Sequence, residues 1–424
     1  MLDYKFIKDN LEAVRENIRN RSVSADPDKV VALYDQRNTL IRELEELRRQ
    51  RNENAAKMKG KMEPEVRKGL IEEGKSLKEQ IAGVEEKMDS LLMELKDAAI
   101  LIPNMAHPDA PVGKEDKDNL ELKRSGEVPC FDFEPKDHVQ LAEALDLVDF
   151  ETAARVSGSK FYYLKNEAVL LEMALTRYAL DILREKGFVL TMTPDIAREE
   201  IAEGIGFNPR GEESNIYTLE GTGTCLVGTA EITLGGYYAG QMVDVSDGPI
   251  LMAGVSHCFR REAGAAGQYS KGLYRVHQFT KIEMFAYCKA EESDDLLLKL
   301  RSIEEEIFSG LEIPFRVVDT CTGDLGGPAY RKFDLEAWMP GRGDEGDWGE
   351  VTSTSNCTDY QSRRLGIRYK DSDGKNRNVH TLNGTAIAIS RGIIAILENF
   401  QQADGSIRIP EKLVPYMGMT EIRR

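Results

Sequence analysis

The chain lacks any long hydrophobic run, since no apolar stretch approaches the roughly 20 residues that cross a bilayer. Its first residues, MLDYKFIKDN, are polar and mixed in charge, unlike a secretory or transit peptide. The 424 residues are 41% hydrophobic and 30% charged, as in ordinary globular proteins. The sequence therefore predicts a cytoplasmic globular protein with no membrane partner, long enough for two or three domains.

Cysteine is scarce, with six residues and no C-x-x-C pair. This spacing argues against the usual zinc sites and against a secreted disulfide framework. We expect unpaired thiols in a reducing compartment.

The glycine-rich phosphate loops are also missing. G-x-x-x-x-G-K-[ST] is absent, and no G-x-G-x-x-G follows a strand pattern. If the chain binds a nucleotide, its phosphates must be held by side chains, and arginine is the obvious candidate.

Positive charge is in deficit, because 56 Lys and Arg face 73 Asp and Glu, for a net charge of −17. That balance argues against nucleic acid, whose phosphates need cations. The deficit is uneven, however, since residues 1–110 carry 20 basic and 22 acidic side chains, a net of −2. Within them, 48–61 (RRQRNENAAKMKGK) holds six basic residues and one acid. This basic patch is compatible with a polyanion site and equally with a solvated helix face.

Two long helices are predicted in an N-terminal domain at 1–110. Apolar positions alternate in steps of four and three along 70–95, and a weaker seam precedes them at 33–51. Gly60 and Pro64 break the pattern between the seams. We expect an antiparallel coiled-coil arm at about 28–99, about 45 Å long, with the basic patch toward its tip. Arms of this kind also serve as spacers or dimer contacts.

The pattern changes after a linker rich in Pro, Asp and Asn at 102–119, and a second domain is expected at 111–424. Helices are predicted near 168–186, 293–309 and 385–401. Strand-like runs outnumber them and do not alternate with them, which predicts an α+β fold with a mainly antiparallel sheet. The runs are LMAGVSHCFR (251–260), LYRVHQF (273–279), KIEMFAYC (281–288), FRVVDTC (315–321) and KFDLEAWM (332–339).

Charged side chains recur along two of these runs. Strand alternation places Arg260 and Glu262 on one face, and an aromatic ring lies among charges on the next run. Such a set is suited to clamp phosphates, stack a base and hold an ammonium group. A solvent-facing charged strand is the alternative, although it has no need of the ring. Along the continuous stretch 275–285, the residues that share a face are Arg275, His277, Phe279, Lys281 and Glu283.

The stretch CFRREAGAAGQYSKGLYRVHQFTKIEMF (258–285) resembles the second signature motif of the class II aminoacyl-tRNA synthetases. Its GAAG and KIE segments resemble the seryl enzymes of bacteria and organelles. Residues 156–194 resemble the first motif, a dimer-interface helix and strand, and 380–401 resemble the third. TAE at 229–231 and GEVTSTSNCTDYQSRR at 349–364 are similar to seryl signatures. The resemblance covers essentially the whole chain, with the motifs in the family's order.

The resemblance implies a serine–tRNA ligase that uses ATP and Mg²⁺. Arg260 would contact the ATP α-phosphate and the serine carboxylate. Glu262 would accept from the adenine amine while Phe279 stacks under the ring. Arg391, and with it Arg275, would hold the outer phosphates.

Glu350 and Ser353 would ligate Mg²⁺, a hard cation that bridges phosphate oxygens. Arg260, Glu262 and Arg391 are thus the implied catalytic residues. The other positions implied to contact ATP are Arg261, Val276, Val351 and Thr352.

The amino acid would lie among polar side chains from several segments. Thr229 and Glu231, with Ala230 between them, would bind the serine ammonium, and Arg260 its carboxylate. A cavity built for a hydroxyl rejects alanine because its polar groups are then left unpaired. The residues implied to surround the hydroxyl are Glu283, Asn383 and Thr385.

The macromolecular partner implied is serine tRNA, or also selenocysteine tRNA, bound by arm residues at about 35–95 across a homodimer. Two departures from the family stand out: Gly228 replaces a usual proline, and 341–350 (GRGDEGDWGE) is longer and more acidic than usual. Three alternatives remain: a ligase that charges a carrier protein, a scaffold on a decayed catalytic domain, and specificity for another amino acid. The arm argues against the first, and the retained arginines argue against the second.

Overall fold

The computed structural model describes residues 1–208, 214–263 and 270–424. Within them the chain forms two compact units, Met1–Met105 and Ala106–Arg424. The six cysteines are free thiols, and all but Cys130 are buried, as their spacing predicts. None of the described helices is long and apolar enough to span a membrane.

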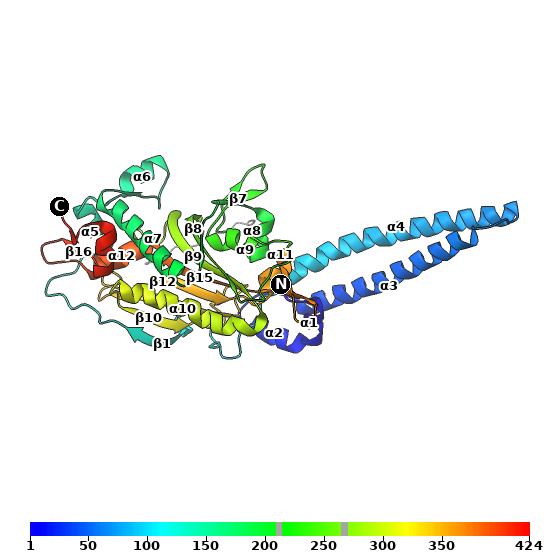
Figure 1. Ribbon diagram of the computed structural model, residues 1–424, viewed down its shortest axis with the longest axis horizontal. Coiled ribbons are helices and arrows are strands. Elements are labelled where there is room, and N and C mark those ends of the chain that lie inside the picture. The colour runs from blue at the N-terminus through cyan, green and yellow to red at the C-terminus, as the bar shows by residue number, and fades with distance from the viewer. Residues whose placement is uncertain (209–213, 264–269) are drawn as a thin grey trace. The chain divides into compact units, whose positions relative to one another are not determined.

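Two long antiparallel helices make up most of the first unit (Figure 1). The predicted helix pair, with a break at Gly60 and Pro64, is confirmed. Asp26 caps the first long helix by accepting from the Lys29 amide at 3.0 Å. The helices of this unit are α1 (Tyr4–Asp9), α2 (Leu11–Asn20), α3 (Pro27–Lys57) and α4 (Pro64–Ile100).

An apolar seam joins α3 to α4, at positions that the heptad pattern predicts. Its most buried members are Leu47, Leu77, Ile81 and Val84. Nearer the turn the seam becomes polar, because buried Asn54 donates to the Glu73 carboxylate at 2.7 Å. A buried amide at such a position fixes helix register at some cost in stability.

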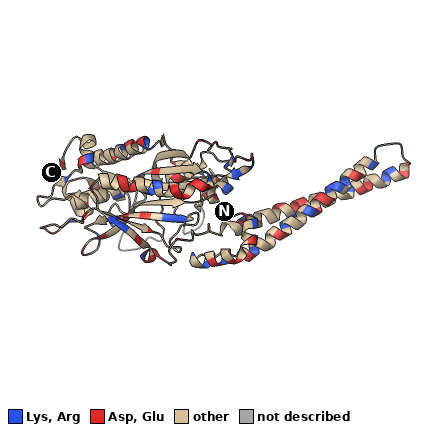
Figure 2. Ribbon diagram, turned by 60° about the horizontal axis from the view of Figure 1, so that its bottom comes forward, with Lys and Arg blue, Asp and Glu red and all other residues tan. Residues whose placement is uncertain are grey.

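The basic patch at 48–61 divides into two groups. Arg48 pairs with Glu85 of α4 at 2.8 Å, and Arg49 pairs with two glutamates of its own helix. The other four are exposed and form no ion pair within the described residues, and we call them the tip cations. Figure 2 shows basic and acidic residues mixed along both helices. The tip cations are Arg51, Lys57, Lys59 and Lys61.

An eight-stranded sheet forms the centre of the second unit, in the order β1-β10-β11-β12-β15-β9-β8-β4. Neighbours are antiparallel except β4 and β8, which run parallel at one edge. The predicted α+β fold with a mainly antiparallel sheet is confirmed. The strands are β1 (Leu120–Ser125), β4 (Val189–Met192), β8 (Ile250–Phe259), β9 (Gln278–Cys288), β10 (Phe315–Asp319), β11 (Arg331–Met339), β12 (Asp347–Asn356) and β15 (His380–Ala388).

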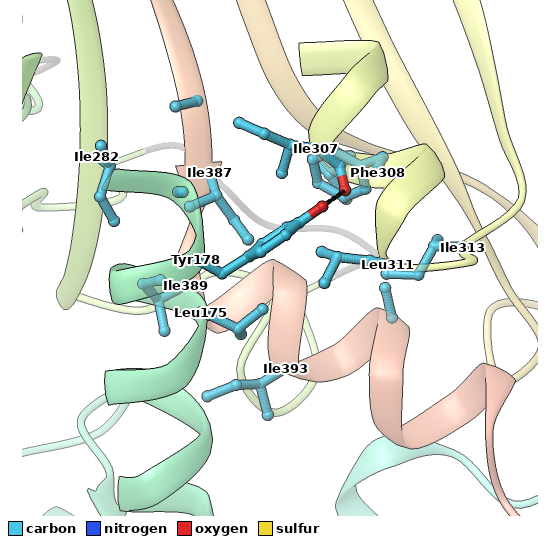
Figure 3. Close-up of a cluster of buried hydrophobic side chains, with 14 of the residues drawn as sticks. Leu175, Tyr178, Ile282, Ile307, Phe308, Leu311, Ile313, Ile387, Ile389 and Ile393 are labelled. Carbon is cyan, nitrogen blue, oxygen red and sulfur yellow. Dashed lines mark hydrogen bonds between the residues drawn. The ribbon is translucent and has the colours of Figure 1, made fainter. Parts of the chain in front are cut away.

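Three helices cover one face of this sheet and bury the main apolar core. Figure 3 shows part of this core, in which Ile282 of β9 belongs to the same cluster as Leu175, Ile307 and Ile393, one from each helix. The Tyr178 hydroxyl lies in the same core and donates to the Ile307 carbonyl at 3.3 Å. The helices are α7 (Glu167–Glu185), α10 (Ser293–Gly310) and α12 (Ile389–Asn399).

Part of the opposite face is covered by three short helices and a small sheet. Phe285 and Tyr287 of β9 pack there against Ile205, Ala230 and Leu234, and the polar side chains of the strands lie on the same face. The covering elements are β5 (Ile196–Arg198), α8 (Glu199–Ile205), β6 (Thr218–Leu219), β7 (Thr224–Leu226), α9 (Ala230–Gly236) and α11 (Tyr360–Leu365).

The remaining elements are short and lie around the sheet. They are η1 (Asp116–Asp118), α5 (His138–Ala144), β2 (Val148–Asp149), α6 (Phe150–Val156), β3 (Tyr163–Leu164), η2 (Ala290–Glu292), β13 (Arg368–Lys370), β14 (Asn376–Asn378), β16 (Ile407–Arg408), η3 (Glu411–Leu413), α13 (Val414–Met417) and β17 (Glu421–Ile422).

Two predicted boundaries are wrong. The helix expected over 385–401 begins only at Ile389, because 385–388 continues β15 and pairs with β9. The strand expected over 273–279 begins only at Gln278. Residues 273–277 form a turn that follows Gly272, whose φ of +60° breaks the extended chain.

Candidate active site

A cavity open to solvent, with about 460 Å³ of empty space, lies where β9, β12 and β15 meet the start of α12. The predicted residues that line it are Arg260, Glu262, Arg275, Val276, Phe279, Glu350, Val351, Thr352, Thr385 and Arg391. Lys281, which the sequence placed on the charged face without a ligand role, lines it too, and so do three residues that sequence reasoning did not select: Tyr274, Ala388 and Ser390. Tyr274 directly precedes Arg275, and this adjacency was the signal in the sequence that could have identified it.

Arg260, which lines the cavity, is held in place by its neighbours. Its guanidinium carbon lies 5.3 Å from the centre of the Phe279 ring, a cation–π contact. Its Nε donates to the Gly228 carbonyl at 3.2 Å, and its amide donates to the His277 carbonyl at 3.0 Å. The side chain is therefore oriented before any ligand arrives.

The strand alternation predicted for Arg260 and Glu262 is wrong, because β8 ends at Phe259 and Glu262 has φ of +49°. Alternation likewise fails for Arg275, which precedes β9. The Glu262 and Arg275 side chains nevertheless line the cavity, and Arg275 Nη1 lies 3.3 Å from Glu262 Oε2. The turn before β9 thus brings Arg275 beside Glu262, although a regular strand was expected to align them.

Arg391 enters the cavity from the first turn of α12. Its Nη1 donates to the Glu350 carbonyl at 2.7 Å and lies 3.3 Å from that residue's carboxylate. Its guanidinium carbon is 4.7 Å from the centre of the Tyr274 ring. Burial opposes the charge, but Glu350 and Tyr274 outweigh it and raise the pKa of Arg391. The arginine is a permanent cation at this end of the cavity.

Glu350 and Ser353 lie on one face of β12 because of a bulge. Residues three apart on a regular strand point to opposite faces. Here Glu350 faces Glu336 and Ser353 faces Asp334, and the register shifts by one residue between these pairs. The extra residue, Val351, therefore rotates both side chains to the same side.

Partial burial opposes ionisation of Glu350, but Arg391 and Lys332 outweigh it and hold its pKa below the usual value. Thr352 points the other way, and its hydroxyl donates to buried Glu304 of α10 at 3.0 Å. Thr352 would therefore contact a ligand in the cavity through its backbone atoms.

A cluster of buried polar side chains adjoins the cavity through Lys281 and Thr385. The Lys281 ammonium lies 2.5 Å from Glu283 Oε2 and donates to the Thr385 hydroxyl at 3.3 Å. That hydroxyl donates to Glu283 at 3.2 Å. Glu283 is only 2% exposed, and Lys281 supplies the counter-charge that such burial requires.

Glu231 extends this cluster from α9. Its Oε1 accepts from Gln361 Nε2 at 2.8 Å and from Asn383 Nδ2 at 3.1 Å. Thr229 caps α9, and its hydroxyl accepts from the Glu231 amide at 3.2 Å. Burial and then the neighbouring Glu283 raise the pKa of Glu231 to about 7. Gln361 was missed, although it lies in a segment that carried the resemblance.

Other predicted residues are placed less centrally. Arg261 does not line the cavity, and its amide donates to the Asn215 carbonyl at 2.9 Å. Ala230 is fully buried at the start of α9. At Gly228 an added Cβ would meet the nearest atom at 3.5 Å, an ordinary contact. The acidic segment at 341–350 is the turn of the β11–β12 hairpin and the first residues of β12. The GAAG segment, 264–267, lies outside the described residues.

Comparison with known proteins agrees with this geometry. Residues 1–106 match the seryl-tRNA synthetase N-terminal domain, and residues 220–400 match the tRNA synthetase class II core domain (G, H, P, S and T). A serine–tRNA ligase of Treponema denticola is 67% identical over 422 residues, covering 100% of both chains. One from Treponema pallidum is 60% identical, covering 99% of this chain and 98% of the relative.

Solved structures give the same result. The seryl-tRNA synthetase of Pyrococcus horikoshii, in complex with ATP, matches with a TM-score of 0.91 and 42% identity, covering 100% of this chain and 99% of that one. The serine–tRNA ligase of Naegleria fowleri, in complex with AMP, matches with a TM-score of 0.87 and 31% identity at the same coverage. With full-length identity this high and arginines and carboxylates gathered around one cavity beside a mainly antiparallel sheet, the chain belongs to the seryl-tRNA synthetase family of class II aminoacyl-tRNA synthetases.

Proposed function

We propose that this chain activates L-serine with ATP and transfers it to the 3′ end of serine tRNA. The observation that carries the proposal is the meeting of Arg260, Phe279 and Arg391 in one cavity, beside the Glu231 and Glu283 cluster. The relatives are named serine–tRNA ligases, and one solved relative holds ATP.

In the first step a serine carboxylate oxygen bonds to the α-phosphorus, and the bond to the bridging oxygen breaks. Pyrophosphate leaves and takes the electron pair of the broken bond on its oxygen. Arg260 would align the two anions and offset charge that builds up between them. Arg391 and Arg275 would hold the departing phosphates, and the Phe279 ring would stack against the adenine ring.

Magnesium would be held by Glu350 and Ser353. Within the described residues no three His, Cys, Asp or Glu side chains gather as a metal site. Mg²⁺ needs no such cage, because it takes one or two carboxylates and completes its shell with phosphate oxygens and water. Glu350 fits, since its pKa is lowered and it shares a face with Ser353. The ion would neutralise the outer phosphates.

In the second step a terminal ribose hydroxyl of tRNA attacks the serine carbonyl carbon, and AMP departs. The α3–α4 arm, about 35–95, is the proposed tRNA contact, through the tip cations. The reaction belongs to the cytoplasm in this proposal, and selenocysteine tRNA is a further candidate substrate.

The amino acid is tested by ATP–pyrophosphate exchange. Serine should support exchange far better than alanine, roughly 10⁴-fold in kcat/KM, because alanine leaves the buried polar cluster unpaired. Threonine should also fail, since its extra methyl group must fit among Glu283, Asn383 and Thr385. Exchange supported equally by alanine or threonine would contradict serine specificity.

Serine binding should depend on pH through Glu231. A pKa raised to about 7 leaves this carboxyl protonated below pH 7, without the charge that binds the serine ammonium. The KM for serine should therefore fall as pH rises through about 7, by up to tenfold per unit on the acidic side. Exchange kinetics between pH 6 and 8.5 measure it, and Glu231→Gln should weaken serine binding and remove the step. A serine KM constant over this range would contradict the assignment.

A homodimer is proposed through α7 and the edge strand β4. An edge strand offers unpaired backbone groups to a second copy, and the adjoining surface is apolar. Its exposed residues are Leu170 (45%), Met173 (59%), Val189 (59%) and Met192 (81%). Sedimentation should show a dimer, and Met173→Asp should shift it to monomer because a charge would be buried. A monomeric native protein would refute this interface.

A further inference from the structure

A buried hydrogen-bonded pair lies outside the residues assigned so far. His138, the first residue of α5, and Glu398 of α12 are both buried, and His138 Nδ1 lies 2.7 Å from Glu398 Oε1. The same oxygen accepts from the His138 amide at 2.9 Å. Because the carboxylate can only accept, the imidazole donates from Nδ1 and its Nε2 is left as an acceptor.

That acceptor is used by the turn before β9. The Leu273 amide donates to His138 Nε2 at 3.2 Å. Gly272 makes the approach possible, since a Cβ there would lie 2.2 Å from Nε2. Lys271 adds an ion pair to Asp137 at 2.5 Å. The whole segment 271–273 is therefore fastened to the start of α5.

The next residue, Tyr274, forms a wall of the active-site cavity. Its ring centre lies 4.7 Å from the Arg391 guanidinium carbon and 4.9 Å from that of Arg342. Its hydroxyl donates weakly to the Glu350 carbonyl at 3.4 Å. Tyr274 thus touches the residues proposed to hold the outer phosphates and magnesium.

The second oxygen of Glu398 fastens another segment. Oε2 accepts from the Gly341 amide at 2.8 Å, next to Arg342 in the β11–β12 turn. Glu398 also lies seven residues after Arg391 on α12, two turns along the same helix face. The Glu398 carboxylate therefore holds two loops against the helix that carries Arg391. It holds segment 271–273 through His138 and the β11–β12 turn directly.

We infer that the His138–Glu398 pair is a positioning device for the outer-phosphate end of the nucleotide site. The inference rests on the proposed function, because it concerns how ATP is held. The His138–Glu398 pair acts through Tyr274 and Arg342 and touches no reactant. It makes no contact with the Glu231 and Glu283 cluster among the interactions described.

The test compares KM values for ATP and serine in ATP–pyrophosphate exchange. His138→Phe keeps a flat aromatic ring, somewhat larger than imidazole, but removes both side-chain hydrogen bonds, and should raise the ATP KM roughly tenfold with the serine KM unchanged. His138→Gln keeps one donor and one acceptor, and should restore the ATP KM to within about threefold of the native value. Tyr178→Phe is the matched control, since it removes a buried hydrogen bond of a side chain that does not line the cavity. It should lower the Tm without moving either KM.

A rise in both KM values alike, no change in the ATP KM, or no rescue by glutamine would overturn the inference. If His138→Phe does not fold, Glu398→Gln carries the test, because an amide oxygen cannot replace both carboxylate oxygens. The same selective rise is expected, and its absence is decisive. Failure of the proposed function would look different, since the native protein itself would then show no serine-dependent exchange.

Discussion

Arg260→Ala should reduce kcat for serine-dependent ATP–pyrophosphate exchange by roughly 10²–10³-fold. The native guanidinium is held by the Phe279 ring and the Gly228 carbonyl, and the His277 carbonyl holds the Arg260 backbone amide. Its charge is thus in place before the two anions meet, with no reorganisation at the moment of reaction. Alanine removes this charge and leaves two anions to repel each other. Single-turnover adenylate formation would show the loss directly in the chemical step.

The variant Arg260→Lys distinguishes the contribution of the side chain's charge to the exchange rate from that of its planar geometry. Lysine keeps the cation but cannot form a planar fork toward phosphate and carboxylate together, so an intermediate rate is expected. The thermal midpoint of both variants should stay close to that of the native protein, because Arg260 is only partly buried. Near-native exchange by a folded Arg260→Ala protein would remove the central residue from the mechanism.

Replacement of 36–92 by a short glycine-containing turn should abolish serine transfer to tRNA and spare adenylate formation. The cut retains Val30, Leu33, Leu95 and Ala99, all buried at the base of the helix pair. It also retains the ion pair between Lys29 and Glu94 at 2.9 Å. The second unit has its own core and sheet, so exchange with serine should stay within about twofold.

A milder variant tests the electrostatic part of this prediction. Glutamine at the four tip cations leaves the seam intact and removes charges that no acidic side chain of the described chain neutralises. The tRNA KM should rise, and its dependence on salt should become shallower by roughly 0.7–0.9 for each phosphate that is no longer neutralised. Unchanged aminoacylation by both arm variants would show that tRNA binds elsewhere and would favour the spacer interpretation of the hairpin.

The first unit could be predicted closely because its pattern is local. Heptad spacing, Gly60 and the proline at the start of α4 set helix lengths and the turn, and the helices follow them. The site was harder to predict. Arg260, Phe279 and Arg391 were selected through the resemblance, yet the alternation argument failed for Arg275, whose turn depends on Gly272 and its contact with α5.

The sequence by itself determined the helical arm, the α+β class and the set of residues that motifs single out. Tertiary structure alone decided how those residues meet. The bulge at Val351 depends on how β11 and β12 pair, and the pKa of Glu231 depends on burial beside Glu283 from another strand. Periodicity reports only neighbours along one segment, whereas register and desolvation are set by partners distant in the chain, which is why neither could be read from the residues alone.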